Sequence, residues 1–495
     1  MQKKFLVNLA LLLFLNLLVK PFWVLGIDRS VQNAVGAADY GFYFSILNFS
    51  FLFNILLDFG ITNFNNRNIA QNNHLLNKHF SSILMLKLLL LGVYLLVTLS
   101  VGLVIGYDSA QFKMLSWVTF NQFLLSFILY LRSNVSGLLL FKTDSLLSVL
   151  DRLLMILFCS ILLWGNVTTS NFQIEWFVYS QTAAYGITAI VAFFVVTYKA
   201  SFKKLVWNRP FVLMILKKSL PFALLVLLMA QYNRIDTVFI ERLLPEGVGS
   251  EQSGIYAQAY RLLDASNMIA FLFAVLLLPL FSKMLKMKQS VEDLVKLSFS
   301  ILFAVSVVIA MVSYFYNLEL MTLLYPIHGT ESPEAYQCRM DESAAILSLV
   351  MFGFVAISTV YVFGTLLTAN GNLKALNIIA ASGVVISVAL NVSLVPQMEA
   401  LGSAYASLTA QFVTSLAQVI AVQIVFKFRV NYKFLFVLLI FVIGVFIGGY
   451  FSKTFSFDWK INAVIMIVYS ILLSFLLRLL HLKKFLEIIK SENID

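Results

Sequence analysis

Residues 81–105 (SSILMLKLLLLGVYLLVTLSVGLVI) form an almost unbroken apolar stretch in which Lys87 is the one charged residue. An α-helix needs roughly 20 apolar residues to cross the hydrocarbon core of a membrane, so this stretch predicts a spanning helix. The whole chain has the same character, because 60% of its 495 residues are hydrophobic and only 12% are charged. So few polar groups cannot cover a surface in water, which makes lipid the main solvent of this chain.

Similar apolar stretches recur along the chain and predict about fourteen membrane-spanning helices. The expected spans are residues 5–27, 41–62, 81–105, 114–134, 144–164, 175–198, 219–242, 255–281, 297–320, 344–368, 374–395, 403–426, 434–451 and 461–480. The predicted fold class is therefore an all-α integral membrane protein.

Basic residues indicate how these helices are oriented. With the N-terminus in the cytoplasm, the cytoplasmic loops and tails hold about four times as many Lys and Arg residues as the opposite loops. This pattern predicts that both termini are cytoplasmic. It also accounts for the net charge of +11 without nucleic-acid binding, since no soluble basic module separates the helices.

The longest predicted cytoplasmic connection, residues 199–218, separates two sets of six helices. Secondary transporters are commonly built from such paired repeats. We therefore expect an N-terminal lobe at residues 1–205 and a C-terminal lobe at 206–430. A helix pair with a cytoplasmic tail is expected at 431–495.

Three cations inside the predicted spans lie at a similar depth in the outer half of the membrane: Lys20, Arg234 and Arg261. A charge at the centre of a spanning helix costs about 2.5 to 3.5 kcal/mol, so such residues normally face a cavity or the interior of the bundle. Few carboxylates in the helices are available to balance these three. The pattern predicts a cationic cavity that binds an anion such as phosphate or pyrophosphate, which suits the planar fork of arginine.

Other charged residues in the spans are candidates for structural ion pairs or for ion coupling, and both interpretations stay open. Asp58 and Lys87 lie at one depth in the inner half, and Asp264 shares a helix face with Arg261. The remaining candidates are Asp151, Arg152 and Asp236. Pro21 is expected to kink the first helix, either as a hinge or as a static bend.

No pattern typical of an enzyme is present in the sequence. The four histidines lie in loops or near the C-terminal end without metal-like spacing, and the two cysteines cannot form a metal site. No P-loop motif occurs, so ATP hydrolysis is not expected. The sequence predicts neither a metal nor a cofactor, and it predicts a protein that is not an enzyme.

Several short motifs resemble those of the Wzx-type polysaccharide flippases. They begin with VGAADYG at residues 35–41, DFG at 58–60 and RNIA at 67–70, and continue with YNRIDT at 232–237 and GIYAQAYR at 254–261. The last set is LN at 390–391, LVP at 394–396 and GSAYA at 402–406. Their order and spacing extend over nearly the whole chain.

This resemblance implies the multidrug/oligosaccharidyl-lipid/polysaccharide superfamily, whose members fold as two lobes around a central cavity. It implies a flippase of the bacterial inner membrane that moves undecaprenyl-pyrophosphate-linked oligosaccharide units to the periplasmic leaflet by alternating access. O-antigen, lipopolysaccharide or capsule assembly would then be the pathway, with a polymerase and a chain-length regulator as partners beside the lipid-linked substrate and membrane lipids. The family's cationic cavity residues correspond to Lys20, Arg234 and Arg261, although related flippases often have arginine in the first helix.

Two alternatives remain. A multidrug or small-molecule exporter can share the fold, but it would be expected to use membrane carboxylates and to bind cations. A membrane-embedded sugar polymerase or ligase needs a sizeable outer loop with catalytic residues, and the loop at 321–343 is short for that purpose.

Overall fold

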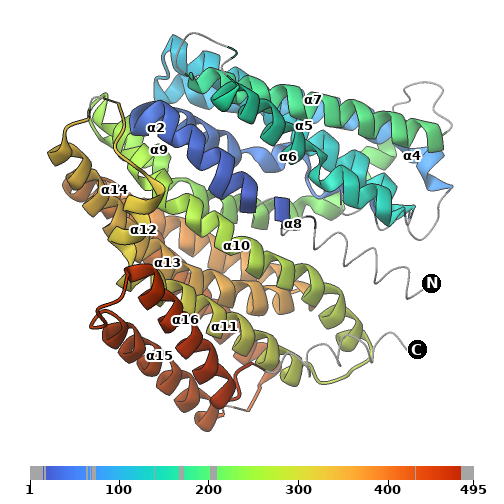
Figure 1. Ribbon diagram of the computed structural model, residues 1–495. Helices are drawn as coiled ribbons and strands as arrows, with labels where there is room; N and C mark the ends of the chain where they lie inside the picture. Colours follow the sequence, from blue (N-terminus) through green and yellow to red (C-terminus); the bar gives the residue numbers. More distant parts are fainter. Residues whose placement is uncertain are drawn as a thin grey trace. The chain divides into compact units, whose positions relative to one another are not determined.

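The computed structural model describes residues 21–62, 74–138, 140–165, 172–200, 209–329, 331–429 and 431–480, with a few isolated positions between them. All regular secondary structure in these residues is helical, which confirms the predicted fold class (Figure 1). Ten described helices are long and apolar enough to cross a membrane, or eleven if one bent pair counts as a single span. One of the ten contains two predicted spans, so the count agrees approximately with fourteen.

The chain divides into two compact units, Met1–Gly254 and Ile255–Asp495. The first unit contains η1 (Trp23–Asp28), α2 (Arg29–Leu52), η2 (Asn54–Leu57), α4 (Leu75–Ile105), α5 (Ser109–Gly137), α6 (Phe141–Trp164), α7 (Ile174–Lys199), α8 (Arg209–Arg234), α9 (Asp236–Leu243) and the start of α10 (Val248–Lys286). The second contains the rest of α10, then α11 (Glu292–Phe315), α12 (Asn317–Leu324), α13 (Pro333–Ala369), α14 (Leu373–Phe426), α15 (Tyr432–Ser452) and α16 (Trp459–Leu476). The boundaries expected from the helix count, after residues 205 and 430, stay predictions.

The first two predicted spans differ from the structure at their ends. The helix does not stop at Ile27, because it continues as the π-helix η1 and then as α2. Its break comes at Gly36, where φ is 86° and ψ is 174°, a conformation that favours glycine. The second helix ends at Leu52, ten residues before the predicted end, and passes into the 3₁₀ turn η2. Hydropathy placed the first boundary at charged residues that the helix in fact contains.

Pro21 lies directly before the irregular turn of the first helix. Proline has no backbone N–H and disrupts the regular α-helical ladder around it. The wide π-turn of η1 begins two residues later, at Trp23. The first helix is therefore irregular beside Pro21, and whether it bends there during transport stays a prediction.

The helix α14 is a hairpin. Its 54 residues would form a straight rod about 80 Å long, far more than the thickness of a bilayer. The helical geometry instead breaks at Glu399, with φ 51° and ψ −134°. The Ser403 hydroxyl donates a 2.6 Å hydrogen bond to the Asn391 side chain, although residues twelve apart in a straight helix are separated by about 18 Å. The eleventh and twelfth predicted spans are therefore the two arms of α14.

Small residues allow α13 and the second arm of α14 to pack at close range. A Cβ atom on Gly353 would lie 2.6 Å from Oε1 of Gln411, and one on Gly364 would lie 2.5 Å from Oε1 of Gln418. Both glutamines are buried. The two glycines therefore serve helix packing, as is common between membrane helices.

Each unit has its own apolar core. In the first unit, buried side chains such as Leu86, Tyr130 and Ile215 form a core that joins α4, α5 and α8. In the second unit, Phe441 and Met466 pack α15 and α16 against α11, and Figure 1 shows α15 and α16 side by side.

In the first unit, α2 crosses the start of α10 at a contact between backbones. A Cβ on Gly41 would lie 1.8 Å from the carbonyl oxygen of Ser250, and one on Gly254 would lie 1.9 Å from that of Ala37. No side chain fits between the two helices at this point. The motifs at 35–41 and 254–261 therefore meet where each contains a glycine.

We expect Gly41→Ala to destabilise the protein, because its new methyl group meets backbone atoms that cannot move independently. Overpacking of this kind costs about 1 to 3 kcal/mol. The measurement is the midpoint of thermal unfolding of the detergent-solubilised protein. Gly186→Ala in α7 is the matched control, because nothing lies within 4 Å of its new Cβ. An equal midpoint for the two variants would contradict the close crossing.

Candidate functional site

The structure brings Asp58 and Lys87 together as an ion pair. Lys87 in α4 is 1% exposed, and its Nζ lies 2.5 Å from Oδ1 of Asp58 in the turn after η2. The same Nζ donates to the carbonyl oxygen of Leu57 at 2.9 Å and to the Ser126 hydroxyl at 3.1 Å. Asp58 also accepts a hydrogen bond from the Thr62 hydroxyl. The buried ammonium is thus fully coordinated and holds α4 to the end of the second helix.

The seventh predicted span is broken between Arg234 and Asp236. Helix α8 ends at Arg234 and α9 begins at Asp236, with a bend of 49° between them. The sequence predicted one continuous helix here, so this break is a correction. Asp236 is 2% exposed, whereas the partly exposed Arg234 places its guanidinium 5.6 Å from the centre of the Phe51 ring.

The break places the start of α9 against α2. The Asn48 side chain donates a 3.0 Å hydrogen bond to the Thr237 hydroxyl. The Ser253 hydroxyl donates to the carbonyl oxygen of Thr237 at 3.2 Å. These polar contacts stabilise the first turn of α9 in its bent position.

In the second unit, Arg261 and Asp264 lie on one face of α10. Nη1 of Arg261 is 3.5 Å from Oδ2 of Asp264, and both side chains are 16% exposed. This is a long contact for an ion pair, with the geometry of residues three apart on a helix. Lys20, the third cation of the predicted cavity, lies outside the described residues.

Arg152 in α6 is held mainly by aromatic rings. Its guanidinium lies 5.6 Å from the ring centre of Trp23 and 5.8 Å from that of Tyr185. The distance from its Nε to Asp151 is 3.9 Å, while Asp151 accepts a 2.8 Å hydrogen bond from the backbone N–H of Arg152. Cation–π contacts to Trp and Tyr therefore contribute to the environment of this partly buried arginine more clearly than its neighbouring carboxylate does.

Asp28 is a buried polar residue that sequence reasoning missed. It is 1% exposed at the end of η1, and the Tyr40 hydroxyl lies 3.0 Å from each of its carboxylate oxygens. One helical turn further, Gln32 is also buried, and neither polar atom of its side chain has a hydrogen-bond partner among the residues that the structure describes. The predicted span ended at Ile27, so Asp28 was placed in a loop. Its helical spacing from Gln32 is the signal that could have revealed it.

Five polar residues form a cluster between the start of α5 and the end of α9, here called the Gln111 cluster: Tyr107, Asp108, Gln111, Glu241 and Arg242. Gln111 Nε2 donates to Glu241 at 2.7 Å, and Gln111 Oε1 accepts from Arg242 at 2.8 Å. The backbone N–H of Gln111 donates to Asp108, which caps α5. The Arg242 guanidinium covers the Tyr107 ring at 4.4 Å, and burial raises the pKa of the Tyr107 hydroxyl. No hydropathy pattern predicts this cluster.

The described residues do not include three His, Cys, Asp or Glu side chains close enough together to hold a metal ion. What the described charges can do is bind an anion, stabilise helix contacts or carry ions. Arg234 and Arg261 lie in different units, and each has the chemistry to hold a phosphate group.

Comparison with known proteins adds a family and a fold. A family model described as polysaccharide biosynthesis protein matches residues 10–285. No curated protein sequence matches the chain.

Three solved structures show the fold. The lipid II flippase MurJ in an inward closed conformation is similar with a TM-score of 0.70 and 14% identity, over 96% of this chain and 98% of that chain. An inward-facing multidrug resistance MATE transporter of the MOP superfamily is similar with a TM-score of 0.57 and 14% identity, over 86% of this chain and 99% of that chain. A MOP superfamily transporter from Pyrococcus furiosus is similar with a TM-score of 0.54 and 14% identity, over 84% of this chain and 92% of that chain. At these identities the likeness establishes the fold alone.

We expect Asp58→Asn to destabilise the protein strongly, because it leaves the buried ammonium of Lys87 without a counter-charge. Breaking a buried pair costs about 3 to 5 kcal/mol, and the low end applies because Asp58 is 26% exposed. The double variant Asp58→Asn/Lys87→Met should recover much of the loss in thermal unfolding measurements.

The matched control is Lys453→Met, which breaks the more exposed pair with Glu319 and should cost less than about 1 kcal/mol. Equal losses for Asp58→Asn and Lys453→Met would show that the pair is not a buried structural contact.

Proposed function

The chain belongs to the polysaccharide biosynthesis protein family, and from this premise we propose that it is a flippase for undecaprenyl-pyrophosphate-linked oligosaccharide repeat units. It moves them from the cytoplasmic to the periplasmic leaflet of a bacterial inner membrane. The proposal includes the orientation with both termini in the cytoplasm. The likeness to transporters and a lipid flippase, none of them described as an enzyme, supports a transport role.

The broken span α8–α9 is the observation that carries the proposal. Irregular backbone at membrane depth is tolerated where it is buried in protein or lines a water-filled cavity, and broken helices commonly mark transporter binding sites. Here the break directly follows Arg234. A cation beside a helix break is suited to an anionic head group.

Arg261 is the second proposed ligand of the pyrophosphate. Its contact with Asp264 is 3.5 Å long, whereas a tight charge-assisted bond is about 2.7 to 2.9 Å. A pyrophosphate group, with several charged oxygens, can compete for a guanidinium held in this way. Lys20 completes the proposed set of cations.

Transport of this kind requires no covalent chemistry. The polyprenyl tail stays in lipid, while the charged head crosses through a cavity that spares it contact with hydrocarbon. In alternating access, contacts that close one side have to open before release. The Gln111 cluster joins α5 to α9, and in the proposed orientation it is suited to close the periplasmic side.

The ion-paired residues fit two roles within this mechanism. The enclosed contacts of Lys87 with Asp58 favour a structural role. Asp151, Arg152, Asp236 and Asp264 remain candidates for coupling transport to an ion, or for structural pairing. A polymerase and a chain-length regulator are proposed partners in the assembly of O-antigen or capsule.

We expect Arg234→Ala and Arg261→Ala to abolish glycan export with little loss of folded protein. Lysine at either position should leave partial activity, because it keeps the charge but loses the bidentate fork of arginine. Membrane-inserted protein and surface glycan are measured together for each variant. Arg209→Ala, an exposed arginine at the other end of α8, is the matched control and should export normally.

Normal export by both alanine variants would rule out the binding role. Loss of protein in step with loss of export would favour a structural role instead. If the alanine variants change the efflux of cationic drugs but leave glycan export unaffected, the result would favour an exporter of the same fold.

A further inference from the structure

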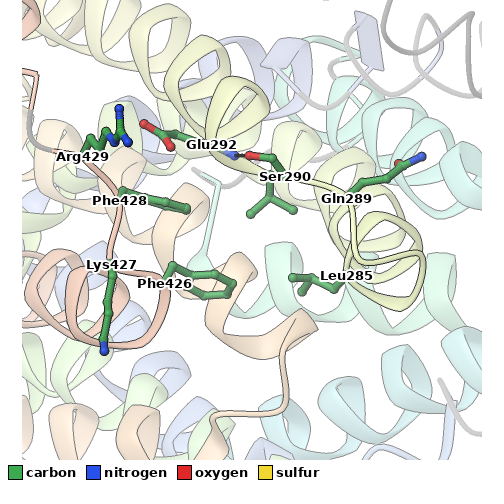
Figure 2. Close-up of a pocket in the computed structure, with 9 residues that line it drawn as sticks. Leu285, Gln289, Ser290, Glu292, Phe426, Lys427, Phe428 and Arg429 are labelled. Atoms are coloured by element: carbon green, nitrogen blue, oxygen red, sulfur yellow. Dashed lines mark hydrogen bonds between the residues drawn. The ribbon is translucent and has the colours of Figure 1, made fainter.

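The second unit contains a cavity of about 340 Å³ at the ends of three helices. Figure 2 shows that its side chains come from the end of α10, the start of α11 and the segment that follows α14. None of the residues proposed for transport lines this cavity. It is therefore a separate feature of the fold.

One part of the cavity lining is apolar. Leu285 lies in the last turn of α10 and Val291 directly before α11, while Phe426 ends α14 and Phe428 follows it. The two phenylalanine rings stack with their centres 5.4 Å apart. Gln423 donates a 2.6 Å hydrogen bond to the carbonyl oxygen of Phe428, which fixes this turn. The segment is thus held in place beside the cavity.

The polar part of the lining has a positive excess. Lys427 and Arg429 line the cavity together with one carboxylate, Glu292. The two segments that form it, 283–296 and 427–433, are basic as a whole. Their charged residues are Lys283, Lys286, Lys288, Lys296, Lys427, Arg429 and Lys433 against Glu292 and Asp293.

Apolar surface begins directly beside these cations. Ile424 is 69% exposed, Tyr432 is 77% exposed and Phe436 is 62% exposed. On a membrane protein such side chains face lipid, so the cavity lies at the level where head groups meet acyl chains. An anionic phospholipid has both the negative head for the cations and the chains for this surface. A free phosphate would use the cations alone.

We propose that this cavity binds the head group of an anionic phospholipid in the adjacent leaflet. Arg429 holds the phosphate, and Lys427, whose side chain points away from Arg429 (Figure 2), adds positive charge beside the cavity. The stacked rings pack against the glycerol region, and the acyl chains follow the exposed residues of α14 and α15. The orientation predicted from the charge distribution makes this the cytoplasmic leaflet. The proposal does not depend on which substrate the protein transports.

The test uses the full-length protein in phosphatidylcholine nanodiscs that contain increasing amounts of phosphatidylglycerol. Native mass spectrometry measures how much phosphatidylglycerol stays bound. Each surface cation contributes about a five-fold change in affinity for anionic lipid. Lys427→Gln/Arg429→Gln should therefore weaken the tightest phosphatidylglycerol binding by more than ten-fold.

Lys142→Gln/Lys374→Gln is the matched control, because it removes two exposed lysines outside the cavity lining and should leave this binding unchanged. The charge-preserving variant Lys427→Arg/Arg429→Lys should also retain it, which separates lost charge from altered folding. The proposal would be overturned if the cavity and control variants weakened phosphatidylglycerol binding equally. It would also be overturned if the parent protein retained phosphatidylcholine as well as phosphatidylglycerol. Displacement of the bound lipid by millimolar inorganic phosphate would indicate a free-phosphate site and would also overturn it.

Discussion

The backbone of a chain in lipid has no water to bond with, and this constraint shapes everything that the structure describes. Every N–H and C=O group has to find a partner within the protein. The apolar stretches are therefore helical, because a helix forms its backbone hydrogen bonds within the segment itself. A break in a helix is then informative, because the backbone groups that it frees need other hydrogen-bond partners nearby. The described breaks at Gly36, Ile235 and Glu399 lie beside close helix crossings or polar side chains. Asp28, Asp58 and Arg234 are next to irregular turns.

The same constraint separates structural charges from those available for a substrate. Lys87 is enclosed by a carboxylate, a carbonyl oxygen and a hydroxyl, so its charge is neutralised inside the protein. Arg234 lies at a helix break, and the contact of Arg261 with Asp264 is 3.5 Å long. The arginines carry the proposed binding role because of where they lie and because a guanidinium can hold two phosphate oxygens at once. Arg152, held by Trp23 and Tyr185, lies between these cases.

The sequence predicted the fold class because long apolar stretches leave few alternatives in lipid. It also predicted that Asp58 and Lys87 lie at one depth, since helix geometry converts sequence position into depth. It failed where a charge lies inside a helix: the first span was ended at Ile27, and buried Asp28 was missed. The break at Ile235 could not be predicted, because neither proline nor glycine marks it. Contacts such as Gln111 with Arg242 join distant residues and leave no periodic signal.

Purified protein in liposomes shows whether this protein moves a lipid-linked sugar across a bilayer. The liposomes contain an undecaprenyl-pyrophosphate-linked oligosaccharide, and an impermeant glycosidase outside cleaves only the sugar in the outer leaflet. The account predicts that cleavage stops near half in protein-free liposomes and goes well beyond half when the protein is present. Cleavage that stops near half with correctly folded protein in the membrane would contradict it.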